Sequence, residues 1–221
     1  KPYDKITDQF GFRKEVILNQ LKEANISLNN IKAVVGRGGL LKPIPGGVYQ
    51  VNEAMKRDLM SSPMGEHASN LGGLIADDLV KALPGARSFI ADPVVVDELD
   101  EVARYAGHPL FQRISIFHAL NQKAIARKHA AVMQRSYEDL NLIVVHLGGG
   151  ISVGAHCQGR VIDVNQALDG EGPFSPERSG GLPAGQLVDW CFAPGANEAD
   201  IRRRITGSGG CLAYLGTADG M

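Results

Sequence analysis

Several features that mark particular classes of protein are scarce or missing in this sequence of 221 residues. Its three cysteines are widely spaced and fit neither a disulfide framework nor a zinc site, which indicates a reducing, cytoplasmic compartment. Lys and Arg number 23 against 24 Asp and Glu, so no basic surplus favours nucleic acid or an anionic membrane. No apolar run approaches the roughly 18 residues of a membrane span. The sequence therefore predicts neither a nucleic-acid nor a membrane partner.

The best-known phosphate-binding patterns are missing as well. The chain contains no G-x-x-x-x-G-K-[ST] and no G-x-G-x-x-G, which excludes a P-loop and a Rossmann turn. No spacing of histidines and carboxylates matches a metal site. Glycine, by contrast, is abundant: it makes up 27 of the 221 residues, well above its usual share of about 7% in proteins. Clusters of glycine in ordered-looking sequence indicate close approach of the backbone to another group.

The pattern of apolar residues predicts an α/β protein of two domains. A region of mixed helices and strands covers residues 1–140, and a hairpin meander opens a second domain over 141–221. Gln158-Gly159 stands where a two-residue hairpin turn is expected, and Asn52 is a candidate helix cap. We expect strands at about 31–35, 88–91, 142–146, 151–156 and 161–164, and helices at about 8–24, after Asn52, 66–83, 95–106, 118–134, 183–192 and 197–206.

The stretch from His146 to Ser152 is the first candidate for chemistry. Gly148, Gly149 and Gly150 follow a predicted strand, and three glycines let consecutive N–H groups converge on a phosphate. A tight hairpin that needs glycine for its geometry explains the same residues equally well.

Two arginines share one local design. Arg37 and Arg178 each stand among glycines in a predicted loop, where a guanidinium can bind phosphate or carboxylate oxygens. A solvated surface arginine is the alternative for each.

Three further residues stand at predicted element ends. Asp92 follows a strand, where ligands bind in α/β sheets, although the local sequence favours the alternative, a cap for a helix that starts at Pro93. His118 stands at a strand-to-helix junction and His67 near a helix start. Core or capping histidines are the commoner explanation for both.

Taken together, these segments resemble the butyrate kinases of the acetate kinase family. The resemblance covers essentially the whole chain and is most specific over residues 33–47, 146–152 and 169–180. It implies two ribonuclease-H-like α/β domains around a cleft, both incomplete in this chain. The first, 1–140, would bind the acyl substrate without its opening strands, and the second, 141–221, would begin a nucleotide-binding domain.

The resemblance also implies a role for each matching residue. Arg37 and Arg178 are similar to the two catalytic arginines, and Asp92 to an active-site aspartate that helps to place Mg²⁺. The other residues that it implies are a catalytic His118; the substrate-binding His67, Asn70 and Phe117; and the ATP-binding His146, Gly148, Gly149 and Gly150.

These assignments imply a carboxylate kinase that uses ATP and Mg²⁺ to make an acyl phosphate, reversibly, from butyrate or a similar short or branched fatty acid. A homodimer or higher homo-oligomer is implied too. The family's first phosphate loop and adenosine-binding segment are missing, so an internal fragment lacking both ends is expected. A kinase of the same superfamily that phosphorylates a hydroxyl, with Asp92 as base, and an inactive truncated remnant are the alternatives.

Overall fold

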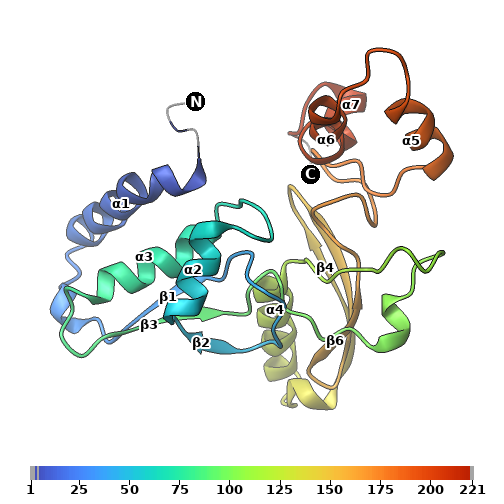
Figure 1. The fold of residues 1–221 in the computed structure, drawn as a ribbon. Coiled ribbons are helices and arrows are strands. Elements are labelled where there is room, and N and C mark those ends of the chain that lie inside the picture. Colours follow the sequence, from blue (N-terminus) through green and yellow to red (C-terminus); the bar gives the residue numbers. More distant parts are fainter. Residues whose placement is uncertain (1–2, 4, 220–221) are drawn as a thin grey trace. The chain divides into compact units, whose positions relative to one another are not determined.

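The computed structural model describes residue 3 and residues 5–219, which form two compact units, Lys1–Val96 and Asp97–Met221 (Figure 1). The predicted division at residue 140 differs from this boundary. Residues 97–140 pack with the later strands: the Asp100 N–H donates to the carbonyl of Ile162, and Arg113 pairs with Asp163 at 2.8 Å.

The first unit is built on a three-stranded sheet of order β1-β3-β2. Strand β1 (Ala33–Arg37) runs parallel to β3 (Arg87–Ala91), and β2 (Val48–Gln50) runs antiparallel to β3. The sequence placed the first strand two residues too early and missed β2, a strand of three residues that follows a Pro- and Gly-rich turn. The helical segments of this unit are η1 (Ile6–Gln9), α1 (Phe10–Glu23), η2 (Leu28–Asn30), α2 (Glu53–Ser61) and α3 (Asn70–Val80).

Helix α3 packs against β1 through direct backbone contact. A β-carbon on Gly36 would collide with the carbonyl of Gly72, and one on Gly72 would collide with the carbonyl of Arg37. Leu71, Ile75 and Leu79 on the same helix form the core of this unit. Helix α3 is shorter than the predicted 66–83, whereas the predicted cap of α2 is confirmed, since Asn52 Oδ1 accepts from the Met55 N–H at 2.9 Å.

The second unit contains the predicted meander. Strands β4 (Asn141–Leu147), β5 (Ile151–Cys157) and β6 (Arg160–Val164) pair antiparallel in sequence order. Gln158 and Gly159 both have positive φ, 49° and 85°, as the predicted two-residue hairpin turn requires. The helical segments are η3 (Glu101–Arg104), α4 (Ala119–Val132), η4 (Tyr137–Asp139), α5 (Ala184–Cys191), α6 (Glu198–Thr206) and α7 (Gly210–Leu215).

The predicted helix at 95–106 is wrong. Only the 3-10 turn η3 forms there, and acidic side chains of the segment are held by ion pairs within it and with other parts of the unit. Asp97 pairs with Arg104 at 2.9 Å, and Glu98 pairs with the buried Lys123 at 2.8 Å. Glu98 also accepts from the N–H of Val161 on β6. Within the described residues, no helix is long and apolar enough to cross a membrane.

The contact between α3 and β1 predicts opposite effects for two helical glycines. Gly72→Ala should lower the free energy of unfolding by about 1–3 kcal/mol, because the methyl group meets backbone atoms that cannot move aside. Gly11→Ala in α1, where a β-carbon meets nothing within 4 Å, should raise it by up to about 1 kcal/mol through helix propensity. Urea denaturation of both variants measures the two changes, and equal effects would contradict the contact.

Candidate functional site

Arg37 and Asp92 lie at the same edge of the first sheet. Arg37 is the last residue of β1 and is paired in register with Ala91, the residue before Asp92. Because β1 and β3 are parallel, their carboxyl ends carry both residues together, at the edge where α/β sheets bind ligands. This arrangement matches what the sequence predicted for Asp92.

The Asp92 carboxylate is held in a fixed position. Asp92 is only 4% exposed and has a φ of 34°, a conformation that Asp tolerates better than most residues. Its N–H donates to the carbonyl of Gly47 at 2.8 Å, and its Oδ1 accepts from the Gly47 N–H at the same distance. The alternative role as a helix cap is wrong, since no helix starts at Pro93.

Asp92 is the residue that the sequence predicts to hold Mg²⁺. No group of three His, Cys, Asp or Glu able to hold a metal occurs in the part of the chain that the structure describes. Mg²⁺ commonly takes one or two protein carboxylates and completes its shell with water and substrate phosphates. Asp92 therefore fits a Mg²⁺ that arrives with a nucleotide better than a resident metal.

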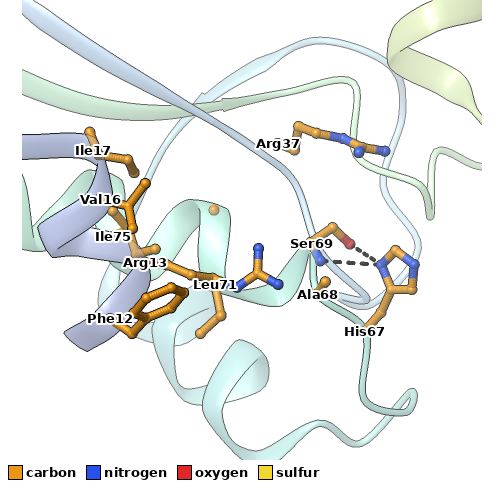
Figure 2. A pocket seen from close by; sticks show the side chains of 11 residues that line it. Phe12, Arg13, Val16, Ile17, Arg37, His67, Ala68, Ser69, Leu71 and Ile75 are labelled. Atoms are coloured by element: carbon orange, nitrogen blue, oxygen red, sulfur yellow. Dashed lines mark hydrogen bonds between the residues drawn. The ribbon is translucent and has the colours of Figure 1, made fainter. Parts of the chain in front are cut away.

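A cavity of about 580 Å³ adjoins Arg37 in this unit. Figure 2 shows Arg37, Ser69 and His67 on one side of it, and Arg13 with the apolar side chains of α1 and α3 on the other. Ser69 Oγ lies 2.6 Å from His67 Nδ1, which also accepts from the Ser69 N–H at 3.2 Å. The cavity thus joins an exposed cation and an oriented imidazole to a mostly apolar side, lined by Phe12, Arg13, Val16, Ile17, Leu71 and Ile75.

Asn70 has its polar contacts inside the protein. It is 1% exposed, and its Oδ1 accepts from the Leu40 N–H at 2.8 Å. Its Nδ2 donates to Ser62 Oγ at 3.3 Å and to the carbonyl of Gly65 at 3.2 Å. The bond to Leu40 fixes the backbone just after Gly38 and Gly39, so Asn70 positions the segment that follows Arg37. Direct contact of Asn70 with substrate stays a prediction.

The loop between β4 and β5 brings Gly148, Gly149 and Gly150 close to Arg178. None of the three glycines has a positive φ, so their backbone conformation does not itself require glycine. The requirement at Gly150 is space, because a β-carbon there would collide with Arg178 Nη1. A β-carbon on Gly149 meets nothing within 4 Å, so this position can carry a side chain.

Hydrogen bonds from the guanidinium and from the backbone N–H fix the position of Arg178. Its Nη1 donates to the carbonyl of Ala167, and its backbone N–H donates to Ser175 Oγ at 3.2 Å. Ser175 Oγ in turn donates to the carbonyl of Gly149 at 2.8 Å, which joins the arginine loop to the glycine loop. Burial lowers the pKa of the guanidinium below its usual value, and Glu177 acts in the opposite direction. A half-buried cation beside a glycine loop is suited to bind an anionic group.

His118 and His146 meet face to face in the second unit. Their ring centroids lie 3.7 Å apart with an interplanar angle of 8°. His118 is the cap residue before α4, and Phe117 beside it is 2% exposed. His118 Nδ1 lies 3.0 Å from Ser152 Oγ, and His146 Nδ1 lies 2.8 Å from Asn121 Nδ2.

The predicted residues therefore gather in two groups, one in each unit. Arg37, His67, Asn70 and Asp92 belong to the first unit, and Phe117, His118, His146, Gly148–150 and Arg178 to the second. Sequence reasoning missed Ser152, Ser175 and Gln122, which bond to these residues from buried positions. Ser152 and Ser175 lie within the specific stretches 146–152 and 169–180, whereas nothing in the sequence marked Gln122.

Solved structures establish the class of fold. An acetate kinase from Porphyromonas gingivalis matches with a TM-score of 0.75 at 20% identity, over 94% of this chain and 56% of its own. A propionate kinase from Francisella tularensis matches with a TM-score of 0.68 at 20% identity, over 93% and 55%. The chain thus has the α/β fold of the acetate kinases, as the sequence predicted.

Sequence comparison then gives the family. The acetokinase family matches residues 105–219, just over half of the chain, and the chain belongs to that family. Butyrate kinase 2 of Clostridium acetobutylicum is 59% identical over 215 residues, which are 97% of this chain and 60% of that protein. A probable butyrate kinase of Bacteroides thetaiotaomicron is 57% identical over 217 residues, 98% and 61%. The chain spans about 60% of the length of these curated relatives.

The contacts of Asn70 predict a stability effect. Asn70→Ala leaves the buried Leu40 N–H without its acceptor, so the free energy of unfolding should fall by about 1–3 kcal/mol. The exposed Asn30→Ala is the matched control and should change it by less than about 0.5 kcal/mol. Chemical denaturation measures both changes. An Asn70→Ala protein as stable as the wild type would contradict the positioning role and favour substrate binding by Asn70.

Proposed function

We propose that the protein to which this chain belongs is a carboxylate kinase. It transfers the γ-phosphoryl group of ATP to butyrate or a similar short or branched fatty acid, reversibly, and forms an acyl phosphate. The observation that carries the proposal is 55–59% identity with butyrate kinases over nearly the whole chain.

The first unit offers groups suited to the acyl substrate. Arg37 can orient a carboxylate through its guanidinium, and the apolar side of the adjoining cavity has room for a short alkyl chain. His67, on the same side of the cavity as Arg37, supplies a second polar group. No general base is needed, since a carboxylic acid is ionised at neutral pH and its oxygen is the nucleophile.

The second unit offers groups suited to phosphates. The N–H groups of Gly148–Gly150 and the ring of His146 would bind ATP, and Arg178 would neutralise charge on the transferring phosphoryl group. The resemblance also implies a catalytic role for His118, whose ring stacks on His146, and substrate binding by Phe117, which is buried beside it. When bound, Mg²⁺ neutralises phosphate charge, and Asp92 is the residue that would hold it.

The proposal extends to the setting of the enzyme. Three free cysteines fit a cytoplasmic protein, and the family resemblance favours a homodimer or higher homo-oligomer. The substrate is a small carboxylate rather than a nucleic acid or a membrane.

The proposal predicts a specific product. The protein, supplied with ATP, Mg²⁺ and butyrate or isobutyrate, should form an acyl phosphate that hydroxylamine traps as a hydroxamate. Glycerol and other sugar alcohols, tested for ATP consumption in parallel, should be inactive. ADP release with an alcohol but no hydroxamate with butyrate would favour the hydroxyl kinase, and no turnover with either would favour an inactive remnant.

Arg178 and Gly150 should act as one unit in catalysis. Arg178→Ala should lower kcat by roughly 10²–10³ with little change in the KM for ATP, because the cation acts mainly in the transition state. Gly150→Ala should lower kcat in part, since its methyl displaces the guanidinium. The double variant should lose no more than Arg178→Ala alone.

The control for this cycle is Arg202→Ala, an exposed arginine of α6 that pairs with Glu198 at 2.7 Å and should keep full activity. Additive losses in the double variant would show that Gly150 does not act through Arg178.

A further inference from the structure

A continuous set of hydrogen bonds leads from the interior of the second unit to His118. Tyr137 Oη lies 2.6 Å from His156 Nδ1, and His156 Nε2 lies 2.9 Å from Gln122 Oε1. Gln122 Nε2 reaches Ser152 Oγ at 2.8 Å, and Ser152 Oγ reaches His118 Nδ1 at 3.0 Å. Tyr137, His156, Gln122 and Ser152 are each 4% exposed or less, so water does not compete for these bonds.

The carbonyl of Ser152 sets the direction of the bonds. A carbonyl accepts and never donates, so the atom of Gln122 that lies 3.1 Å from it must be the amide nitrogen. Gln122 Oε1 then faces His156 and accepts, which requires a proton on His156 Nε2. His156 Nδ1 in turn accepts from the Tyr137 hydroxyl.

The same reasoning fixes the proton at the other end. Ser152 Oγ accepts from Gln122 Nε2, so its own proton needs another acceptor, and His118 Nδ1 lies within reach. A neutral His118 that accepts at Nδ1 carries its proton on Nε2.

We propose that Ser152, Gln122, His156 and Tyr137 form a positioning chain that holds His118 as the neutral tautomer with its proton on Nε2. The ring then presents an N–H rather than a lone pair to an anionic group. In the reaction proposed above, on which this use of His118 rests, that group is a phosphoryl oxygen.

The surroundings of His156 keep its ring neutral, which the direction of these hydrogen bonds requires. Burial and the nearby ammonium of Lys123 lower the pKa of His156 to about 4, against a smaller opposite effect of Glu98. Tyr137 and Gln122 are its hydrogen-bond partners, and Arg127 lies over the Tyr137 ring at 5.8 Å. His156 therefore stays neutral near neutral pH and accepts at Nδ1.

Two residues of β5 are explained by this arrangement. A β-carbon on Gly154 would collide with Gln122 Oε1 and lie 3.1 Å from His156 Nε2, so glycine reserves the space that their bond occupies. Ser152 is the centre of Gly150-Ile151-Ser152-Val153-Gly154, which has the Gly-x-Ser-x-Gly form of a nucleophile elbow. Such an elbow exposes its serine at a strand-to-helix turn. Ser152 is 0% exposed within a sheet strand, so its hydroxyl serves the internal bonds instead.

The test is a long-range ¹H–¹⁵N correlation spectrum of the histidine rings in the labelled protein near neutral pH. We expect His118 to show a protonated Nε2 and an unprotonated Nδ1. Ser152→Ala removes the proton donor to Nδ1, and the His118 signals should move to those of a mixture of tautomers. A wild-type His118 protonated at Nδ1, or one whose signals do not change in Ser152→Ala, would overturn the proposal.

A second variant keeps the test decisive if Ser152→Ala does not fold. Tyr137→Phe keeps the buried ring but removes the hydroxyl at the far end of the chain, so it should shift the signals of His156 and, more weakly, those of His118. The exposed Tyr105→Phe is the matched control and should shift neither. Shifts confined to His156 would show that the chain does not reach His118 and would overturn the proposal.

Kinetics separate this proposal from the proposed function. If butyrate is phosphorylated, Ser152→Ala should lower kcat by up to about 10²-fold at unchanged KM for ATP, the cost of a misoriented group. A kcat equal to that of the wild type would overturn the role of the chain in the reaction. If no acyl phosphate forms at all, the proposed function fails, whereas the spectra still decide the tautomer of His118.

Discussion

The direct contact of α3 with β1 is the packing on which the first unit depends. The backbone of Gly72 occupies the space that a β-carbon of Gly36 would fill, and the reverse contact places the carbonyl of Arg37 against Gly72. Arg37 therefore leaves the sheet at a point fixed by two backbones rather than by flexible side chains. Gly39 extends the same arrangement, because its missing β-carbon leaves room for Asn70 Oδ1, which binds the N–H of Leu40.

In the second unit, buried polar groups do the corresponding work. Lys123 is 2% exposed and pairs with Glu98, and Glu98 also binds the N–H of Val161. Breaking one partner of such a pair leaves an uncompensated charge in the interior, which is strongly destabilising. The pair therefore joins α4, the segment around Glu98 and β6 into one body. Every buried side-chain nitrogen and oxygen within the described residues has a hydrogen-bond partner, as expected for an interior with this many polar groups.

Local sequence signals predicted most of the elements correctly. Apolar periodicity and turn residues gave the meander, the hairpin at Gln158-Gly159 and the cap at Asn52, since these depend on neighbours in the chain. The failures involved partners outside the segment: Glu98, within the segment 95–106 where no helix forms, pairs with Lys123 of α4, and three residues sufficed for β2 because β3 lay beside them. The site shows the same division. Asp92 and the arginines were recognisable from their glycine and proline neighbours, whereas Gln122, in the first turn of α4, carried no signal.

The amide of Gln122 has a further consequence for the chemistry of this interior. A neutral amide accepts at its oxygen and donates at its nitrogen. His156 therefore faces an acceptor and the carbonyl of Ser152 faces a donor, although the side chain of Gln122 carries no charge. Gln122→Glu would change a single group, yet it would turn the donor that faces the carbonyl of Ser152 into a second acceptor and add a negative charge beside it. Because Gln122 is fully enclosed, the network should tolerate this substitution less well than an exposed glutamine would.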